Sequence, residues 1–262
     1  MKIARRILTT IAVTLAVIFI GIYWIAPVAL SLYSSRKALP ITRVVPTDLR
    51  DRSVSQAAGA KLSYLGYEFE APWSDLDESK TELYPKDKPD KNMARLHFRS
   101  GLQLVVITGQ PHSMADQMTK TDFKMSPQAF AAVFGQQAAD SDYAFMKRVL
   151  EFSPDKMHPW AFSTTVESRE QVLLLIKSLV PSKPAETGIF NLRTANYKGF
   201  QQGNPEIRQD TLLLDLYSAD GSFEIFFVQK NYTSPAGVTQ PEINRIVQTL
   251  HKDSTQLATT EK

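Results

Sequence analysis

The chain has 262 residues, 43% of them hydrophobic, with 30 Lys and Arg against 27 Asp and Glu. Eight of the cations but only two of the acids precede Ser53, so the rest of the chain is slightly acidic and has no basic face of the kind that binds nucleic acid. The absence of cysteine excludes disulfides, thiolate nucleophiles and cysteine-ligated metals, so a folded domain depends on its hydrophobic core.

Near the N-terminus, residues 7–35 carry no charged side chain. At 1.5 Å per residue, a run of about 20 apolar residues crosses a hydrocarbon core of about 30 Å as a helix. We therefore predict a transmembrane helix over residues 7–33 that begins at Ile7 and has Trp24 and Tyr33 at the lipid–water boundary, which aromatic rings prefer. A cleaved signal peptide has a shorter apolar core of about 7–15 residues, which favours a retained anchor, although a small-x-small pattern at Ala29 leaves cleavage open.

The cations on either side of this segment predict its orientation. Lys2, Arg5 and Arg6 precede it directly, whereas the cations after it are spread over residues 36–52. Because cations close to the membrane favour the cytoplasmic side, we expect residues 1–6 to be a cytoplasmic tail. The protein is then a single-pass protein of the cell (inner) membrane, bound to the lipid bilayer through residues 7–33, with its C-terminal domain outside the cytoplasm.

Residues 34–52 are expected to form a stalk. Pro40 and Pro46 disfavour helix at the residue before each, and the charges suit either a solvated linker or contact with anionic lipid headgroups. A single domain is expected over residues 53–252, because nothing in it resembles a long linker. Residues 253–262 are polar and are expected to be a disordered tail.

The domain is predicted to open with strands. Leu62 and Tyr64 precede Gly66, and Tyr67 and Phe69 follow it, an alternation that predicts strand structure with a bend or a tight turn at the glycine. The next segment, residues 72–92, contains prolines among clustered Asp and Lys and is expected to be an exposed loop.

A clear hairpin is predicted after this loop. Its arms, residues 93–98 and 102–109, flank Gly101, which supplies the positive φ that a short turn needs. The first arm is expected to have an apolar face and a polar face. The polar face consists of Arg95, His97 and Arg99.

Residues 112–180 have helical character. Ser126 as the N-cap, a proline at the first helical position and Gly135 past the end predict one helix. A second helix is expected from residue 140 or 141 to about residue 152. A capping-box pattern at residues 164–167 predicts the start of a third, which ends before Pro181.

The last part of the domain returns to strands and closes with a helix. Residues 211–218 and 222–230 flank a turn at Ala219–Gly221, and both segments have apolar residues on both faces, so the sheet is expected to be covered on two sides. An apolar stripe from Pro241 to Leu250 predicts the final helix. The predicted class is α+β: an N-terminal transmembrane helix followed by a mainly antiparallel sheet with helices packed on both faces.

The order of these elements resembles a known fold. The run from Gly66 to Trp73, together with the hairpin and helix of residues 211–251, is similar to the PsbP-like α/β/α sandwich. The resemblance covers a minor part of the domain, and residues 112–160 would be an insertion. It implies a non-enzymatic assembly or binding module, and it carries no functional residue over to this chain.

No motif for catalysis or metal binding is present. The four histidines include neither the HExxH motif nor a pair at helical spacing; they are His97, His112, His158 and His251. The G-x-S-x-G motif is absent, and the S-x-x-K spacing at Ser153 lacks its partner motifs. We therefore predict no catalytic, cofactor-binding or metal-binding residue and no cofactor.

The candidate interaction residues are Arg95, His97 and Arg99. Two arginines beside a histidine on one strand face suit an anionic ligand or partner, although an ordinary solvent-facing strand has the same pattern. The sequence thus predicts a non-catalytic binding or assembly module with an envelope protein as partner. Two alternatives stay open: an extracytoplasmic hydrolase that joins His97 to the acids of residues 75–82, and a membrane sensor or regulatory subunit.

Overall fold

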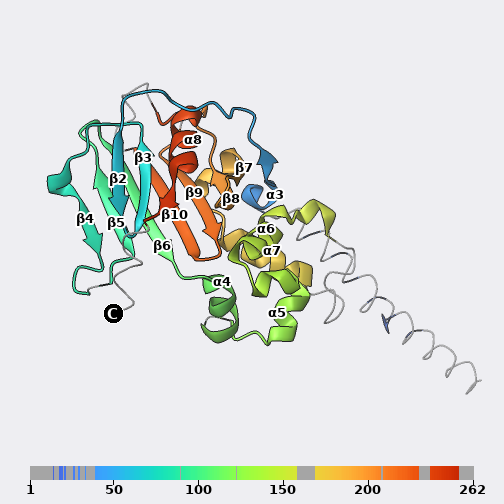
Figure 1. The fold of residues 1–262 in the computed structure, drawn as a ribbon. Coiled ribbons are helices and arrows are strands. Elements are labelled where there is room, and N and C mark those ends of the chain that lie inside the picture. Colours follow the sequence, from blue (N-terminus) through green and yellow to red (C-terminus); the bar gives the residue numbers. More distant parts are fainter. Residues whose placement is uncertain are drawn as a thin grey trace, which may run out of the picture.

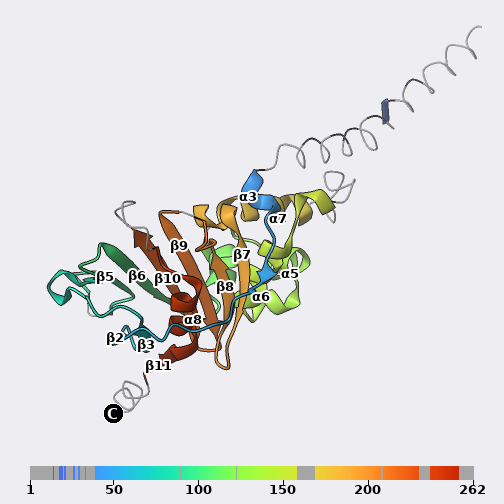
Figure 2. The same cartoon turned by 90° about the horizontal axis from the view of Figure 1, so that it is seen from above.

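The computed structural model describes residues 39–88, 90–121, 123–157, 169–207, 209–229 and 237–253, together with single residues between 14 and 33. Two β-sheets and several helices make up this part of the chain, and helices lie on both sides of the larger sheet (Figures 1 and 2).

The larger sheet has eight strands in the order β1-β7-β8-β9-β10-β6-β5-β4, and its neighbouring strands are antiparallel except for β1 and β7. The strands are β1 (Thr47–Asp48), β4 (Glu82–Tyr84), β5 (Met93–His97), β6 (Leu102–Gly109), β7 (Ile189–Arg193), β8 (Lys198–Gln202), β9 (Thr211–Ser218) and β10 (Gly221–Gln229). The predicted α+β class and the mainly antiparallel sheet are confirmed.

A small sheet and the last helix cover one face of the large sheet. β2 (Ala60–Tyr64), β3 (Tyr67–Ala71) and β11 (His251–Lys252) form the small sheet, and α8 (Gln240–Thr249) packs on β3. Their apolar side chains share one core with the central strands. The buried residues of this core include Phe69, Leu104, Leu214, Phe223, Ile225, Phe227, Ile243 and Ile246.

A block of helices covers the other face over β7, β8 and β9. It comprises α3 (Pro40–Arg43), α4 (Ser113–Asp116), the π-helix Gln117–Thr121, α5 (Pro127–Phe134), α6 (Asp142–Glu151) and α7 (Arg169–Leu179). A second core joins this block to Ile189, Phe200 and Tyr217 of the sheet. Because side chains alternate along a strand, Leu216 and Tyr217 of β9 point into different cores.

Short 3₁₀ helices occur at the turns; they are η2 (Glu78–Lys80), η4 (Gln136–Ala139), η5 (Pro154–Lys156) and η6 (Lys183–Thr187).

Two helix starts can be compared with the sequence: the predicted cap at Ser126 and the predicted helix start at residue 140 or 141. Ser126 Oγ accepts a hydrogen bond from the Ala129 N–H at 3.2 Å at the start of α5, and Ser141 Oγ accepts one from the Ala144 N–H at 3.3 Å at the start of α6. α5 ends at Gly135, whose φ is +92°. The predicted start of the third helix at residues 164–167 lies outside the described residues.

The segment predicted to be a stalk belongs in part to the domain. Ile41 and Thr42 are buried, and β1 pairs with β7. Lys177 of α7 is buried as well, and its ammonium donates hydrogen bonds to the carbonyl oxygens of Val44 at 2.8 Å and Leu150 at 2.6 Å. The domain therefore begins before Ser53, because this proline-containing segment places an isoleucine in the helical core and is bonded to α7.

The segment of residues 72–92, predicted to be an exposed loop, is only in part a loop in the structure. It contains β4, which pairs with β5 at the edge of the large sheet, and the Asp75 carboxylate accepts a hydrogen bond from the Ser100 N–H at 2.7 Å. The polar residues and prolines of this segment thus surround an edge strand, which has backbone hydrogen bonds to a neighbouring strand on one side only.

The predicted ends of the chain fall largely outside the described residues. Ile7 and Trp24 are not among them, and Tyr33, which is, has 62% of its surface exposed. Across the described residues, no helix combines the length and the apolar character that crossing a membrane requires. From the predicted tail only Asp253 is described, and its N–H donates to the carbonyl oxygen of Gly66 at 2.8 Å.

Candidate functional site

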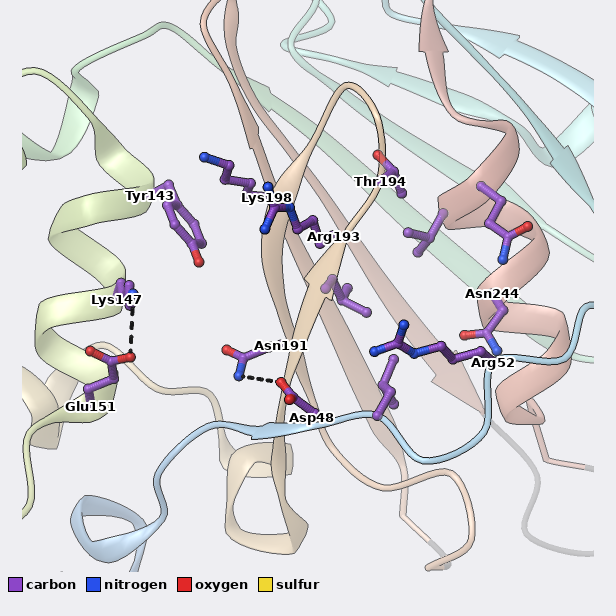
Figure 3. A pocket seen from close by; sticks show the side chains of 14 residues that line it. Asp48, Arg52, Tyr143, Lys147, Glu151, Asn191, Arg193, Thr194, Lys198 and Asn244 are labelled. Carbon is purple, nitrogen blue, oxygen red and sulfur yellow. Dashed lines mark hydrogen bonds and ion pairs between the residues drawn. The ribbon is translucent and has the colours of Figure 1, made fainter.

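A cleft of about 660 Å³ lies between α6, the β7–β8 hairpin, α8 and residues 48–52 (Figure 3). We call it the hairpin cleft. Four cationic side chains line it against two carboxylates, Asp48 and Glu151. The cations are Arg52, Lys147, Arg193 and Lys198.

The hairpin places two of these cations side by side. Arg193 ends β7 and Lys198 begins β8, and the two residues are register partners, so their side chains leave the same face of the sheet (Figure 3). The turn between them is closed by hydrogen bonds in both directions: the Thr194 N–H donates to the Tyr197 carbonyl oxygen at 2.9 Å, and the Tyr197 N–H donates to Thr194 Oγ1 at 3.0 Å. A short, bonded turn therefore holds the pair at the mouth of the cleft.

Tyr143 of α6 forms the aromatic wall. Its ring stacks on Phe200 of β8, with centroids 5.5 Å apart and planes inclined by 14°. The Lys198 ammonium lies 5.9 Å from the centroid of the same ring, within the range of a cation–π interaction. The tyrosine thus fixes the position of α6 against the hairpin and orients one of the cations.

Arg52 reaches the cleft from the opposite side. Asn244 of α8 donates hydrogen bonds to the carbonyl oxygens of Asp51 at 3.1 Å and of Ser53 at 2.7 Å, on either side of the arginine. The backbone that carries Arg52 is therefore attached to a helix, while its guanidinium lies in the cleft (Figure 3).

The two carboxylates of the cleft offset only half of the charge of its four cations. Asp48 accepts a hydrogen bond from the Asn191 side chain at 3.1 Å, and Glu151 pairs with Lys147 at 3.7 Å. In the part of the chain that the structure describes, neither Arg52, Arg193 nor Lys198 forms an ion pair with a carboxylate. Arginine and lysine without such partners are suited to bind carboxylate or phosphate groups.

A second hollow of about 410 Å³ also borders the hairpin turn and shares Tyr143, Arg193, Thr194 and Lys198 with the first. Its Asp142 carboxylate accepts hydrogen bonds at 3.1 Å from the backbone N–H groups of Ser113 and Met114, so it holds the start of α4. Ala195 and Asn196, at the tip of the hairpin, are exposed.

The residues singled out from the sequence lie elsewhere. Arg95 and His97 are on β5, which four strands separate from β7 in the sheet, and Arg99 follows β5 in the turn. The Arg95 guanidinium is 3.8 Å from the Glu82 carboxylate and 5.8 Å from the Tyr84 ring. The role of this face as an anion or partner surface stays a prediction, and the face contributes nothing to the hairpin cleft.

Two acids of the 75–82 segment, Asp77 and Glu82, have pKa values that do not suit the proton transfers of a hydrolase. The pKa of Asp77 is lowered to about 2 by a hydrogen bond from Ser79 and then by Lys80. The pKa of Glu82 is likewise lowered to about 2, by hydrogen bonds from Lys86 and Tyr84. Both groups are weak bases that stay ionised, whereas a general base or acid works best with a pKa near the operating pH.

The pKa of one buried carboxyl group is raised and not lowered. Burial, and then the charge of Glu224, raise the pKa of Asp215 on β9 to about 8. The group lies beneath the helical block, where the Gln202 side chain donates a hydrogen bond to it and in turn accepts one from the Ser182 N–H at 2.8 Å. Asp215 belongs to the framework under the cleft, because it lines neither hollow.

Within the described ranges, no group of three or more His, Asp or Glu side chains is arranged to hold a metal ion. His158, one of the histidines weighed from the sequence, lies outside those ranges.

Sequence reasoning missed the residues of the cleft. Arg52 was assigned to the stalk, and the strands that carry Arg193 and Lys198 were not delimited. An available signal was the pair of cations at Arg193 and Lys198 across the short polar segment 194–196, which is compatible with a hairpin turn.

No protein-family model matches the chain, and neither a curated protein nor a solved structure matches it. The resemblance to the PsbP-like sandwich therefore stays a prediction.

Proposed function

We propose that the protein is a membrane-anchored, extracytoplasmic binding module that holds an anionic component of the cell envelope in the hairpin cleft. The anchor in this proposal is the predicted transmembrane helix of residues 7–33 in the cell (inner) membrane. Its support is the uncharged run of residues 7–35 with the cluster Lys2, Arg5 and Arg6 directly before it.

The observation that carries the proposal is the set of three cations in the cleft that form no ion pair with a carboxylate among the described residues. Arg52, Arg193 and Lys198 come from two sides of a hollow whose volume of about 660 Å³ matches that of small-molecule sites, which range over about 300–1,000 Å³. Their backbones are fixed by the hairpin turn and by Asn244, so a ligand does not have to order them. Guanidinium groups bind carboxylate and phosphate with two parallel hydrogen bonds, which makes these the favoured ligand groups.

We favour binding without catalysis. The cleft has cations, amides and a tyrosine, and its two carboxylates are already engaged by Asn191 and Lys147. The hydrolase alternative is not supported by the ionised Asp77 and Glu82, and no observation favours the sensor alternative over a simple binding module.

Calorimetric titration of the full-length protein in detergent micelles tests the proposal, with inorganic pyrophosphate and citrate as probes. We expect at least one probe to bind, and we expect its affinity to fall as sodium chloride is added, since exposed charges are screened. Arg193→Gln and Lys198→Gln should each weaken binding about tenfold, equivalent to about 1.4 kcal/mol, through the loss of one charged contact.

Arg95→Gln is the matched control, because the Arg95 side chain is 42% exposed and lies on the same sheet, but four strands separate its strand from β7. Its affinity should equal that of the wild type. Failure of both probes to bind, or an equal loss in the Arg95→Gln variant, would contradict the proposed role of the cleft.

A further inference from the structure

α7 has an exposed apolar face in addition to its buried one. Leu173 and Ile176 lie in the helical core, whereas Leu175 and Leu179 are 51% and 66% exposed. The two exposed leucines are four residues apart, so they lie one turn apart on the same side of the helix. A surface helix of a globular protein ordinarily has polar residues on the side that faces away from its core.

The start of the domain brings another exposed leucine to the same end of the molecule. α3 packs on α7, and Leu39, which directly precedes α3, is 54% exposed. Figures 1 and 2 show α3 and α7 at the same end of the domain. We call Leu39, Leu175 and Leu179 the leucine patch.

The chain connects this patch to the predicted anchor by a short segment. Leu39 follows Tyr33, the last residue of the predicted transmembrane helix, by six positions. Even a fully extended chain of that length spans only about 20 Å. In an anchored protein this end of the domain is therefore kept close to the bilayer.

The charged residues near the patch permit contact with a lipid surface but contribute little attraction to it. Lys156 of η5 and Lys183 of η6 are exposed, and both 3₁₀ helices pack on α3. Glu186 of η6 is exposed as well and offsets one of them. Attraction to anionic headgroups is thus modest, and removal of the leucines from water is the larger effect.

We propose that the leucine patch lies against the headgroup region of the membrane that holds the anchor, an inference that rests on the proposed function. The contact orients the domain. The β7–β8 hairpin tip, which carries Arg193 and Lys198, points away from α3 and α7 in Figure 2 and is therefore directed away from the bilayer. A ligand in the surrounding envelope space then reaches the hairpin tip without passing along the membrane.

Spin-label accessibility tests this orientation in the full-length protein reconstituted into liposomes. Because the chain has no cysteine, single labels are introduced by Leu175→Cys, Leu179→Cys and, at the hairpin tip, Ala195→Cys. A fourth label, Val17→Cys, reports on the predicted anchor itself. Collision with oxygen, which partitions into lipid, is compared with collision with a water-soluble nickel chelate at each site.

We expect the labels at positions 175 and 179 to be several-fold less accessible to the nickel chelate than the label at position 195, and more accessible to oxygen. If position 17 is in lipid but positions 175 and 179 behave like position 195, the orientation is wrong and the anchor stands. If position 17 is itself aqueous, the proposed membrane anchor fails. Shielding of positions 175 and 179 from both reagents would show that protein covers the patch, which also overturns the inference.

Discussion

At the scale of single residues, Asp215 links the stability of the domain to pH. The side chain is 4% exposed and lies opposite Glu224 in the register of β9 and β10, and burial also raises the pKa of Glu224. Because the pKa of Asp215 rises from 3.8 to about 8, the folded protein keeps a proton between these values that the unfolded chain has lost. Stability from this group is therefore complete below pH 3.8 and is lost as the pH rises toward 8.

Asp215→Asn should remove this dependence. The wild type is expected to lose stability with a slope of up to about 1.4 kcal/mol per pH unit, whereas an uncharged amide leaves only the smaller contribution of Glu224. Thermal unfolding of the full-length protein in micelles at about pH 5 and about pH 7.5 measures the difference. Asp116→Asn, at an exposed residue paired with Lys120, is the control and should keep the wild-type slope. Equal slopes in Asp215→Asn and the wild type would show that Asp215 is ionised in the fold.

At the scale of secondary-structure elements, local signals were enough wherever a cap or a glycine turn is present. Ser126 was predicted to cap α5, and a helix was predicted to begin at residue 140 or 141; Ser126 and Ser141 each accept a capping hydrogen bond from the backbone. The β9–β10 hairpin has Gly221 at its turn, where φ is +136°. Residues other than glycine rarely adopt this backbone conformation. These elements depend on neighbouring residues, so their signals are contained in short windows of sequence.

The β7–β8 hairpin lacks such a signal. Its turn has no glycine and is closed by the Thr194 side chain and backbone. The hairpin cleft is even harder to predict from the sequence. Its cations are residues 52, 147, 193 and 198, which only the tertiary fold brings together. The same holds for Ile41, whose burial depends on contacts with helices far along the chain.

The hairpin also depends on a glycine in β8. A Cβ atom at Gly199 would lie 1.9 Å from the Asp215 carbonyl oxygen of the adjacent strand. Gly199→Ala should therefore force β8 away from β9, lower the thermal midpoint and weaken probe binding in the cleft together. Gly237→Ala is the matched control, because its nearest neighbour, at 3.3 Å, is the flexible Gln229 side chain. If Gly199→Ala behaves like Gly237→Ala in unfolding and titration, the close packing of β8 on β9 does not support the site.

At the scale of the whole molecule, the two faces of the large sheet are covered by elements with different roles. The small sheet and α8 complete a core on one face, whereas the helical block on the other face forms a wall of the cleft and carries the leucine patch. The sequence predicted this class of fold, but not the surface on which its cations gather, because Arg52, Lys147, Arg193 and Lys198 are far apart along the chain.

Labelling of Ala195→Cys with a membrane-impermeant maleimide, in cells whose inner membrane is intact and whose outer side is accessible, tests the central claim most directly. Ala195 lies at the hairpin turn, and the cysteine-free background makes the label specific. We predict labelling without lysis, at a rate that pyrophosphate slows. Labelling that requires lysis would contradict the extracytoplasmic location, and a rate that pyrophosphate leaves unchanged would contradict anion binding at the hairpin.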